Sequence, residues 1–428
     1  LIASSIQESG FTAALVNRKE ATHADYNAVF WFNAFVSLLL YLLLFLCAPL
    51  IAAFYGIPEL TSLARYSFIG FFISSLGISH SAYLQRHLMV KQRAVSSVLA
   101  LVVSGIVGVT LAYCGFSYWG IATQSMVYVA VCTACYWHYT RWRPTWPVDL
   151  SPVREMFGFS GKLLVTNILN HINNNLFSVL LGRLYSEQEV GYYNQANKWC
   201  GMGQQFIAGM INGVAQPVLR QVADDVERQK RVFRKMLRFT AFVSFPALLG
   251  LALIAEELII ITITDKWLFS VPMLQILCIS GSFYPIAHLY QQLIISKGKS
   301  KVYMWNTLSL GLLLLLGVML VHPYGIYAML AVYVSIQILW LLTWHYFVQQ
   351  VIGLKLRHAL ADILPYALIA AAVMAVTYYV TFSIDNCYFR FVCKMGLAVA
   401  LYVAAMWASR SVTFKESLAF FTKKKIND

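Results

Sequence analysis

Residues 29–55 read VFWFNAFVSLLLYLLLFLCAPLIAAFY, a continuous apolar stretch without a charged side chain. A helix needs about 20 such residues to cross roughly 30 Å of hydrocarbon, so this stretch predicts a transmembrane helix. Eleven further stretches of similar character follow. The predicted spans are 29–55, 63–84, 95–116, 118–139, 156–181, 191–214, 238–262, 272–295, 302–322, 325–348, 360–382 and 389–409. We therefore expect an all-α polytopic membrane protein with about twelve complete helices.

The composition supports a membrane protein and argues against a soluble enzyme. Of the 428 residues 59% are hydrophobic and 12% are charged, and the mean hydropathy is +0.65. Soluble proteins carry about 25% charged residues. The sequence has no nucleotide-binding loop, dinucleotide fingerprint, zinc-ligand spacing or pair of carboxylates in a polar loop. We therefore predict a transporter rather than an enzyme, with no cofactor, no metal and no direct use of ATP.

The distribution of Lys and Arg predicts how the chain crosses the membrane. Of its 32 Lys and Arg residues, 25 fall in alternate loops and the tail, three fall in the opposite loops, and four fall inside spans. By the positive-inside rule, the 25 lie in the cytoplasm together with the C-terminus. The formal charge of +14 is thus explained by topology, and we predict a multi-pass protein of the bacterial inner membrane that binds no nucleic acid.

An internal duplication predicts two lobes. Ala34–Ser37 recurs as Ala241–Ser244, and Trp137–Tyr139 recurs as Trp344–Tyr346, both at an offset of 207 residues. The offset contains six spans, an even number, so the two copies enter the membrane in the same direction and form parallel repeats. The alternative is a bundle of unrelated helices that match by chance.

The duplication also gives the expected domain organisation. Leu1 is not an initiating Met, and Leu1–Ile6 reads as the end of an earlier helix. We therefore expect an N-terminally truncated chain that lacks the first helix and most of the second. The expected parts are an incomplete N-terminal lobe (1–145), a C-terminal lobe (146–352), a terminal helix pair (353–409) and a basic cytoplasmic tail (410–428).

Two consecutive spans carry stripes of polar residues. The positions in each stripe follow helical spacing and so share one helix face. Lipid does not solvate such a face, which must meet water or other protein groups. The alternatives are a water-filled cavity and hydrogen bonding between helices. The stripes are Asn167, Asn170, His171, Asn174 and Ser178 on the first span, and Asn194, Asn197, Lys198, Gln205, Asn212 and Gln216 on the second.

The charges within and beside the spans are mostly positive. Lys162 and Lys198 lie inside the two polar spans, and Arg183 lies between them. Arg binds phosphate with two hydrogen bonds and Lys acts as a point charge, so the sequence favours an anionic ligand. For each cation alone the alternative is a side chain that extends to the membrane interface. Further cations are Arg65, Arg390 and Lys394, and the acids nearby are Glu8, Glu256 and Glu257.

Short motifs in a fixed order resemble the Wzx-type polysaccharide flippases, through nearly the whole chain. This group lies in the multidrug/oligosaccharidyl-lipid/polysaccharide exporter superfamily. The resemblance implies a usual architecture of fourteen helices, in two six-helix lobes plus a terminal pair. The motifs are Glu8–Phe11 with Ala14–Val16 and Arg18–Lys19, Phe30–Asn33, Leu181–Arg183, Gly191–Asn194, Gln216–Leu219 and Asp265–Trp267.

The resemblance implies that the protein moves a polyprenyl-diphosphate-linked oligosaccharide across the inner membrane for surface polysaccharide synthesis. The implied partners are this substrate, membrane lipids, a polysaccharide polymerase and a chain-length regulator. One departure is Asn173–Asn175, which stands where many relatives carry an Asp, so ion coupling through this helix is in doubt. The alternatives are an ion-coupled exporter of small amphipathic drugs, disfavoured by the few acids, and a membrane scaffold that transports nothing.

We expect a cationic cavity between the lobes and alternating access around it. Arg183 and Lys198 are predicted to hold the diphosphate, with help from Lys162. The polar stripes are predicted to bind sugar hydroxyls. The complete predicted set is Lys162, Asn167, Asn170, His171, Asn174, Arg183, Asn194, Lys198 and Gln205.

Overall fold

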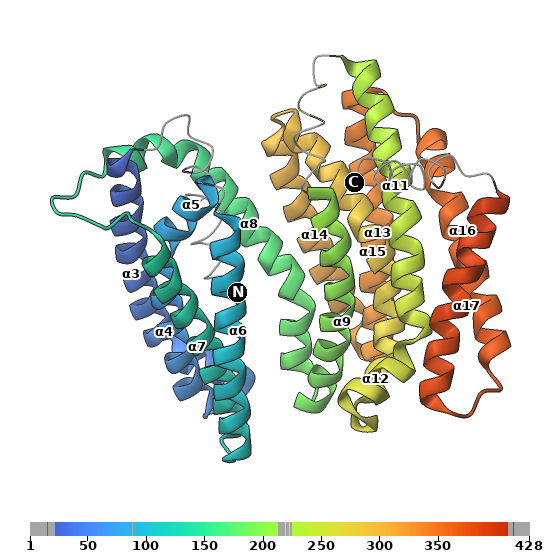
Figure 1. Ribbon diagram of the computed structural model, residues 1–428, viewed down its shortest axis with the longest axis horizontal. Helices are drawn as coiled ribbons and strands as arrows, with labels where there is room; N and C mark the ends of the chain where they lie inside the picture. Colours follow the sequence, from blue (N-terminus) through green and yellow to red (C-terminus); the bar gives the residue numbers. More distant parts are fainter. Residues whose placement is uncertain are drawn as a thin grey trace. The chain divides into compact units, whose positions relative to one another are not determined.

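The computed structural model describes residues 15, 22–87, 89–212, 219, 222, 225–409 and 414, with only the backbone given at 90, 154–169, 174, 210, 212 and 300. Within these ranges the chain is helical and contains no strand (Figure 1). The helices are α3 (His23–Tyr55), α4 (Leu60–Ser75), α5 (Ile78–Arg86), α6 (Val90–Tyr113), α7 (Ser117–Tyr139), α8 (Ser151–Leu184), α9 (Glu187–Asn212), α11 (Val226–Leu253), α12 (Ala255–Ile263), α13 (Ser270–Ser296), α14 (Ser300–Val321), α15 (Ile326–Ile352), α16 (Leu356–Thr381) and α17 (Cys387–Ala408).

Each of the twelve predicted spans coincides with one helix or with two consecutive helices, so the predicted all-α polytopic fold is confirmed. Among the described helices, eight are long and apolar enough to cross a membrane, or nine if the bent pair α4 and α5 counts as one span. Helices α7, α8 and α9 are long enough but less apolar. For α8 and α9 the cause is the polar stripes that the sequence showed. The predicted helix end at Leu1–Ile6 and the basic tail 410–428 lie outside the described residues, apart from Phe414.

The first long helix, α3, has a clear signal at each end. At its start Thr22 accepts a hydrogen bond from the Asp25 N–H at 3.4 Å, while the Asp25 carboxylate accepts one from the Thr22 N–H at 2.8 Å. This reciprocal capping box satisfies backbone donors that the first helical turn leaves open. At its end Gly56 adopts φ of 73°, a left-handed conformation that costs glycine little. The apolar stretch between these two ends therefore forms one helix.

Helices α4 and α5 form a span that is bent by 41°. The bend lies at Leu76 and Gly77 and breaks the regular backbone hydrogen bonds of the helix. Two side chains of α7 bond the carbonyls near the bend: Trp137 Nε1 donates to Leu76 O at 2.9 Å, and Thr133 Oγ1 donates to Ile73 O at 3.4 Å. A bent transmembrane helix is stable when neighbouring groups satisfy the freed carbonyls, and α7 supplies these groups.

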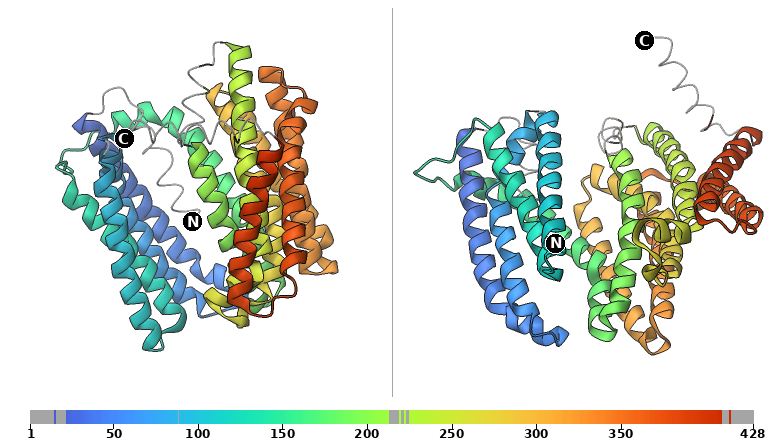
Figure 2. Two further views of the ribbon diagram at one scale, coloured as in Figure 1. Left: turned by 45° about the vertical axis from the view of Figure 1, so that its right-hand side comes forward. Right: turned by 60° about the horizontal axis from the view of Figure 1, so that its bottom comes forward.

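The chain divides into two compact units, residues 1–174 and 175–428. In unit 1, α3 packs on α4, α6 packs on α7, and α4 packs on α7 (Figure 2). An aromatic cluster joins these helices to the chain that follows α7. His80 is fully buried in it, with its ring stacked on Trp137 at 4.4 Å and edge-on to Trp142 at 5.1 Å. His80 is therefore a core residue rather than the interfacial residue that its place near a helix end suggests.

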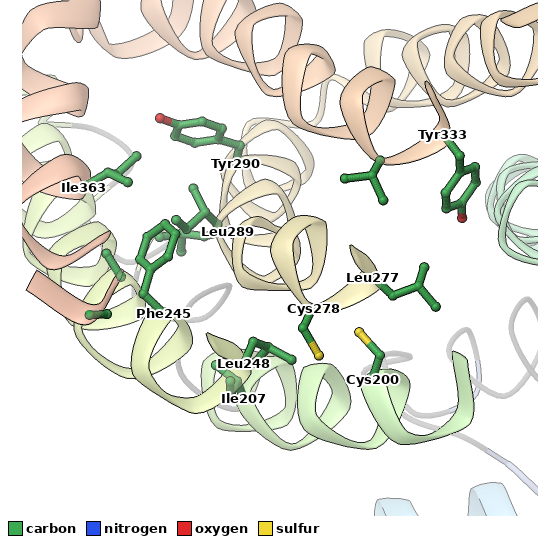
Figure 3. Packing of buried hydrophobic residues seen from close by; sticks show 14 of the residues in the cluster. Cys200, Ile207, Phe245, Leu248, Leu277, Cys278, Leu289, Tyr290, Tyr333 and Ile363 are labelled. Atoms are coloured by element: carbon green, nitrogen blue, oxygen red, sulfur yellow. The ribbon is translucent and has the colours of Figure 1, made fainter. Parts of the chain in front are cut away.

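Unit 2 has a larger apolar core, built where α13 packs against α9, α11 and α15. The ring of Tyr290 stacks on Phe233 at 5.4 Å. Figure 3 shows Cys200 of α9 and Cys278 of α13 with their sulfur atoms pointing toward each other, beside Leu277. These side chains are buried, and burying each large apolar group contributes roughly 1.5–3 kcal/mol. The core thus holds α9 firmly by one face.

The helices repeat at the same offset of 207 residues as the sequence. Adding 207 to the bounds of α3, α4 with α5, α6 and α7 gives ranges that overlap α11, α13, α14 and α15. The contacts repeat too: α3 packs on α4 as α11 packs on α13, and α6 packs on α7 as α14 packs on α15. Pro285 inside α13 lies one residue beyond the position equivalent to Gly77. The division at 145 and 352 stays a prediction.

Two clusters of ions attach the terminal helices α16 and α17 to the rest of unit 2. In one, Asp362 of α16 is an ion-pair partner of Arg234 at 2.6 Å and of Arg238 at 3.2 Å, both on α11. In the other, one carboxylate oxygen of Glu257 on α12 lies 2.7 Å from the Lys394 ammonium and 2.6 Å from Arg390 Nε, both on α17. Glu257 therefore compensates the charges of Arg390 and Lys394, which from the sequence alone were expected to favour an anionic ligand.

Candidate functional site

The candidate site lies in unit 2, on the hairpin formed by the end of α8 and by α9. The turn between the two helices is short: α8 ends at Leu184, α9 begins at Glu187, and Ser186 caps the start of α9. The Ser186 N–H and hydroxyl donate to the Glu189 carboxylate at 3.1 and 2.7 Å, and the Glu189 N–H donates back to the Ser186 hydroxyl at 3.3 Å. This capping box fixes where α9 begins and so fixes which of its side chains face the core.

Helix α9 has a buried apolar face and an exposed polar face. Tyr193, Ala196, Cys200 and Ile207 are buried and follow helical spacing. They pack on α11 and α13, which contact α9 along this side. Four residues of the predicted polar stripe are offset around the helix from this face, and all four are exposed. They are Asn194, Asn197, Lys198 and Gln205.

The predicted stripe on α9 is thus an exposed face of its unit. A membrane-spanning helix with such a face needs water or a polar partner, since hydrocarbon would leave its amides and its charge without hydrogen bonds. The small residues Gly201 and Gly209 lie on the same helix, and a Cβ added at either would meet no atom within 4 Å. The face has open space beside it within its unit.

A hydrogen bond joins the two polar stripes. The Ser178 hydroxyl of α8 donates to Oδ1 of Asn194 at 2.8 Å. Arg183 lies five residues further along α8, and Lys198 lies one turn further along α9 in the opposite direction, since the two helices are antiparallel. With a rise of 1.5 Å per residue, the two Cα atoms are separated by roughly 13 Å along the hairpin axis. Both cations are exposed, so one diphosphate contacts both only when the two side chains extend toward each other.

The structure does not bring all predicted residues together. Arg183, Asn194, Lys198 and Gln205 share the hairpin of unit 2. Asn170 and His171 are half-buried and belong to unit 1, on the earlier part of α8. The side chains of Lys162, Asn167, Asn174 and Asn212 lie outside the described residues, as do residues 216–218 of the predicted motif Gln216–Leu219. The site described by the structure is therefore the hairpin.

Three other predicted cations join helices to one another. Arg390 and Lys394 are ion-paired to Glu257, whose side chain is fully buried. Arg65 Nε donates to Phe45 O at 3.3 Å, and its guanidinium lies 4.3 Å from the centre of the Phe45 ring. These three cations attach helices to one another. Among the cations predicted inside or beside the spans and described with side chains, Arg183 and Lys198 are the exposed ones.

No group of three or more His, Cys, Asp or Glu side chains that could hold a metal occurs in the described part of the chain. All eight cysteines are free thiols. The exposed face of α9 carries amides and one ammonium group, and such groups donate hydrogen bonds to hydroxyl and phosphate oxygens. The face thus offers hydrogen-bond donors and acceptors and one positive charge.

Comparison with known proteins decides the family. Residues 1–272 match the model of a family described as "Polysaccharide biosynthesis protein". The chain belongs to this family. Because the match covers more than half of the sequence, the predicted resemblance to polysaccharide flippases is confirmed.

Curated relatives of this polysaccharide biosynthesis protein are named for the synthesis of several different polymers. "Teichuronic acid biosynthesis protein TuaB" of Bacillus subtilis is 27% identical over 413 residues, which cover 94% of this chain and 83% of TuaB. "Lipopolysaccharide biosynthesis protein WzxC" of Escherichia coli is 24% identical over 304 residues, 70% of this chain and 61% of WzxC. "Succinoglycan biosynthesis transport protein ExoT" of Rhizobium meliloti is 24% identical over 297 residues, 69% of this chain and 60% of ExoT.

Solved structures show the same fold. The lipid II flippase MurJ, in an inward closed conformation, gives a TM-score of 0.74 at 15% identity, over 97% of this chain and 90% of MurJ. An inward-facing multidrug resistance MATE transporter gives a TM-score of 0.63 at 14% identity, over 87% of each chain. Family and fold together confirm a multi-pass membrane protein of the transporter type rather than an enzyme. The drug-exporter alternative is less supported, since the relatives named above belong to polysaccharide synthesis.

Proposed function

We propose that this protein is a flippase that moves polyprenyl-diphosphate-linked oligosaccharide units across the bacterial inner membrane by alternating access. The family and the transporter fold support this function, since surface polysaccharides need lipid-linked intermediates on the outer leaflet. The observation that carries the proposal is the exposed face of α9, where amides and a cation take the place of the apolar residues expected on a membrane helix.

The proposed roles follow from the chemistry of each side chain. Arg183 and Lys198 hold the diphosphate from opposite ends of the hairpin, because guanidinium and ammonium groups form charge-assisted hydrogen bonds with phosphate oxygens. Asn194 and Gln205 offer both donors and acceptors to sugar hydroxyls. The remaining proposed contacts are Lys162, Asn167, Asn170, His171 and Asn174.

The separation of the two cations along the hairpin gives a further expectation. At roughly 13 Å between Cα positions along the axis, neither Arg183 nor Lys198 enforces the position of the other. Each contributes its own contact with the diphosphate, so either single Ala variant keeps part of the activity. The double variant removes both contacts and loses much more.

We also propose a topology and partners. The excess of Lys and Arg in alternate loops supports a cytoplasmic C-terminus. A flippase of this kind delivers its substrate to a polysaccharide polymerase and a chain-length regulator, which are the proposed protein partners. A cysteine placed near Arg357, in a predicted cytoplasmic loop, tests the topology, since it should react with a membrane-impermeant thiol reagent only in inverted vesicles.

The experiment that tests the function compares two double variants at equal protein level. Arg183→Ala with Lys198→Ala removes both cations of the hairpin. Lys266→Ala with Arg357→Ala removes two exposed cations elsewhere in unit 2 and serves as the control. The readout is the fraction of lipid-linked oligosaccharide that an impermeant reagent modifies on the outer face of spheroplasts. The hairpin variant should lose most of this fraction and the control should keep it; equal activity of both refutes the assignment.

A further inference from the structure

A cavity of about 350 Å³ lies within unit 1, between the bent pair α4–α5 and helices α6 and α7. At about 30 Å³ per molecule of liquid water, this volume corresponds to about twelve waters. Its size therefore suits a small polar group such as a phosphate ester with a short hydroxylated chain. Six of the residues that line it carry the argument. They are Ser81, Gln85, Arg93, Tyr128, Thr133 and Tyr136.

The lining of the cavity is polar and carries one positive charge. Arg93 of α6 is half-buried, and the Tyr136 hydroxyl of α7 lies within hydrogen-bonding reach of its guanidinium. The residues around the cavity include no Asp or Glu, and Arg93 forms no ion pair in the part of the chain that the structure describes. A guanidinium enclosed among hydroxyl and amide groups, without a carboxylate, is the arrangement that binds an anion.

The second copy of the repeat shows that the fold alone does not require this cavity. Gly77, Ser81 and Thr133 border the cavity in the first copy. Adding the offset of 207 residues places Tyr284, His288 and Trp340 at the equivalent positions of the second copy. Small side chains in one copy therefore stand where the other copy has three rings.

The bend between α4 and α5 helps to form the cavity. It lies at Leu76 and Gly77, and Thr133 and Trp137 of α7 hold it through hydrogen bonds to carbonyl groups. A Cβ atom at Gly77 would lie 3.1 Å from Thr133 Oγ1, which is tighter than ordinary van der Waals contact. Even one added methyl group would press on the wall, so the space depends on glycine at this position.

We propose that this cavity binds a phosphate ester, with Arg93 on the phosphate and the Ser81, Tyr128 and Tyr136 hydroxyls on a hydroxylated substituent. Arg93 and Gln85 lie at helix ends that the distribution of Lys and Arg assigns to the cytoplasmic face. The headgroup of an anionic lipid such as phosphatidylglycerol combines both chemical features, and free phosphate supplies the first. The residues that line this cavity belong to unit 1, and none of them is among the proposed substrate contacts.

The test measures binding of a short-chain phosphatidylglycerol to the purified full-length chain in phosphatidylcholine nanodiscs, by native mass spectrometry. Arg93→Gln should weaken binding at least tenfold. Lys91→Gln, which removes an exposed cation two residues earlier on α6, should leave it unchanged. Ser81→Leu should also abolish binding although it keeps the charge, because it fills the cavity. Each variant is accepted only when its thermal unfolding matches that of the parent chain.

Two further arms identify the source of the phosphate and the result that overturns the proposal. Competition by millimolar inorganic phosphate supports the site with a free anion as ligand, and no competition supports it with a lipid headgroup. Short-chain phosphatidylcholine should bind more weakly than phosphatidylglycerol, because its headgroup lacks the hydroxyl groups and the net charge. The proposal is overturned if Lys91→Gln weakens binding as much as Arg93→Gln, or if Ser81→Leu binds like the parent chain.

Discussion

Glu257→Gln should be among the most destabilising single substitutions in unit 2, because it removes the counter-charge of the buried Lys394 and one of the two carboxylates beside Arg390. One Glu257 oxygen lies 2.7 Å from the Lys394 ammonium and 2.6 Å from Arg390 Nε. The Glu257 side chain is fully buried and Lys394 is 5% exposed. Lys394 would keep its hydrogen bond to Leu253 O at 3.1 Å, and the amide oxygen of Gln would offer it a neutral acceptor but no counter-charge.

The size of the effect follows from burial. Removing one partner of a buried ion pair costs about 3–5 kcal/mol, because the remaining charge stays desolvated. The neighbouring residue Glu256 provides a matched control on the same helix. Its side chain is 50% exposed and lies 3.4 Å from Arg390, and an exposed pair of this kind contributes about 0.2–1 kcal/mol. Glu256→Gln should therefore change stability several-fold less than Glu257→Gln.

The assay is reversible unfolding of the full chain in mixed micelles by titration with sodium dodecyl sulfate. A double variant, Glu257→Leu with Lys394→Met, should recover much of the loss, since apolar groups of similar volume can replace a buried pair at little cost. If Glu257→Gln costs no more than Glu256→Gln, then Glu257 is hydrated rather than buried against α17, and the attachment of the terminal helices described above is wrong.

Three further substitutions test other parts of the fold by the same unfolding measurement. Asp362→Asn should lower the free energy of unfolding by about 3–5 kcal/mol, because this buried carboxylate is the partner of two arginines of α11. A loss under about 1 kcal/mol would show that these ion pairs do not hold α16 on α11. Gly281→Val should lower the free energy of unfolding by about 1–3 kcal/mol through overpacking, since a Cβ there lies 2.9 Å from Cys200 Sγ. Gly201→Ala is the control and should be tolerated, because a Cβ there meets no atom within 4 Å. Thr22→Ala should cost about 1 kcal/mol through loss of the cap of α3, and no change would mean that the cap does not hold the helix.

Hydropathy was sufficient to predict the helices, because crossing a membrane imposes a length and a composition that are visible in the sequence. The stretch 29–55 and the later apolar stretches all became helices. The polar stripe on α9 was also predictable, since helical spacing alone puts Asn194, Lys198 and Gln205 on one face. The structure adds that this face is exposed in its own unit and that the stripe joins α8 through Ser178.

Contacts between distant segments were not predictable from local pattern. Glu257 and Lys394 are 137 residues apart, so nothing nearby in the sequence indicates that they neutralise each other. Arg93 lies just before the predicted span 95–116, yet it lines a cavity together with residues of α4, α5 and α7. The fate of each charged side chain depends on tertiary packing, which one sequence without relatives does not reveal.

The central claim is that the exposed face of α9 contacts the diphosphate-linked oligosaccharide. Site-specific photo-crosslinking tests this contact directly, in cells whose lipid-linked oligosaccharide carries a radiolabelled sugar. A photoreactive amino acid replaces Asn194 or Gln205. The control position is Leu316, an exposed apolar residue of α14. The account predicts labelled adducts at Asn194 and Gln205 and none at Leu316. Equal labelling at all three positions, or none at α9 in a variant that still exports polysaccharide, would contradict it.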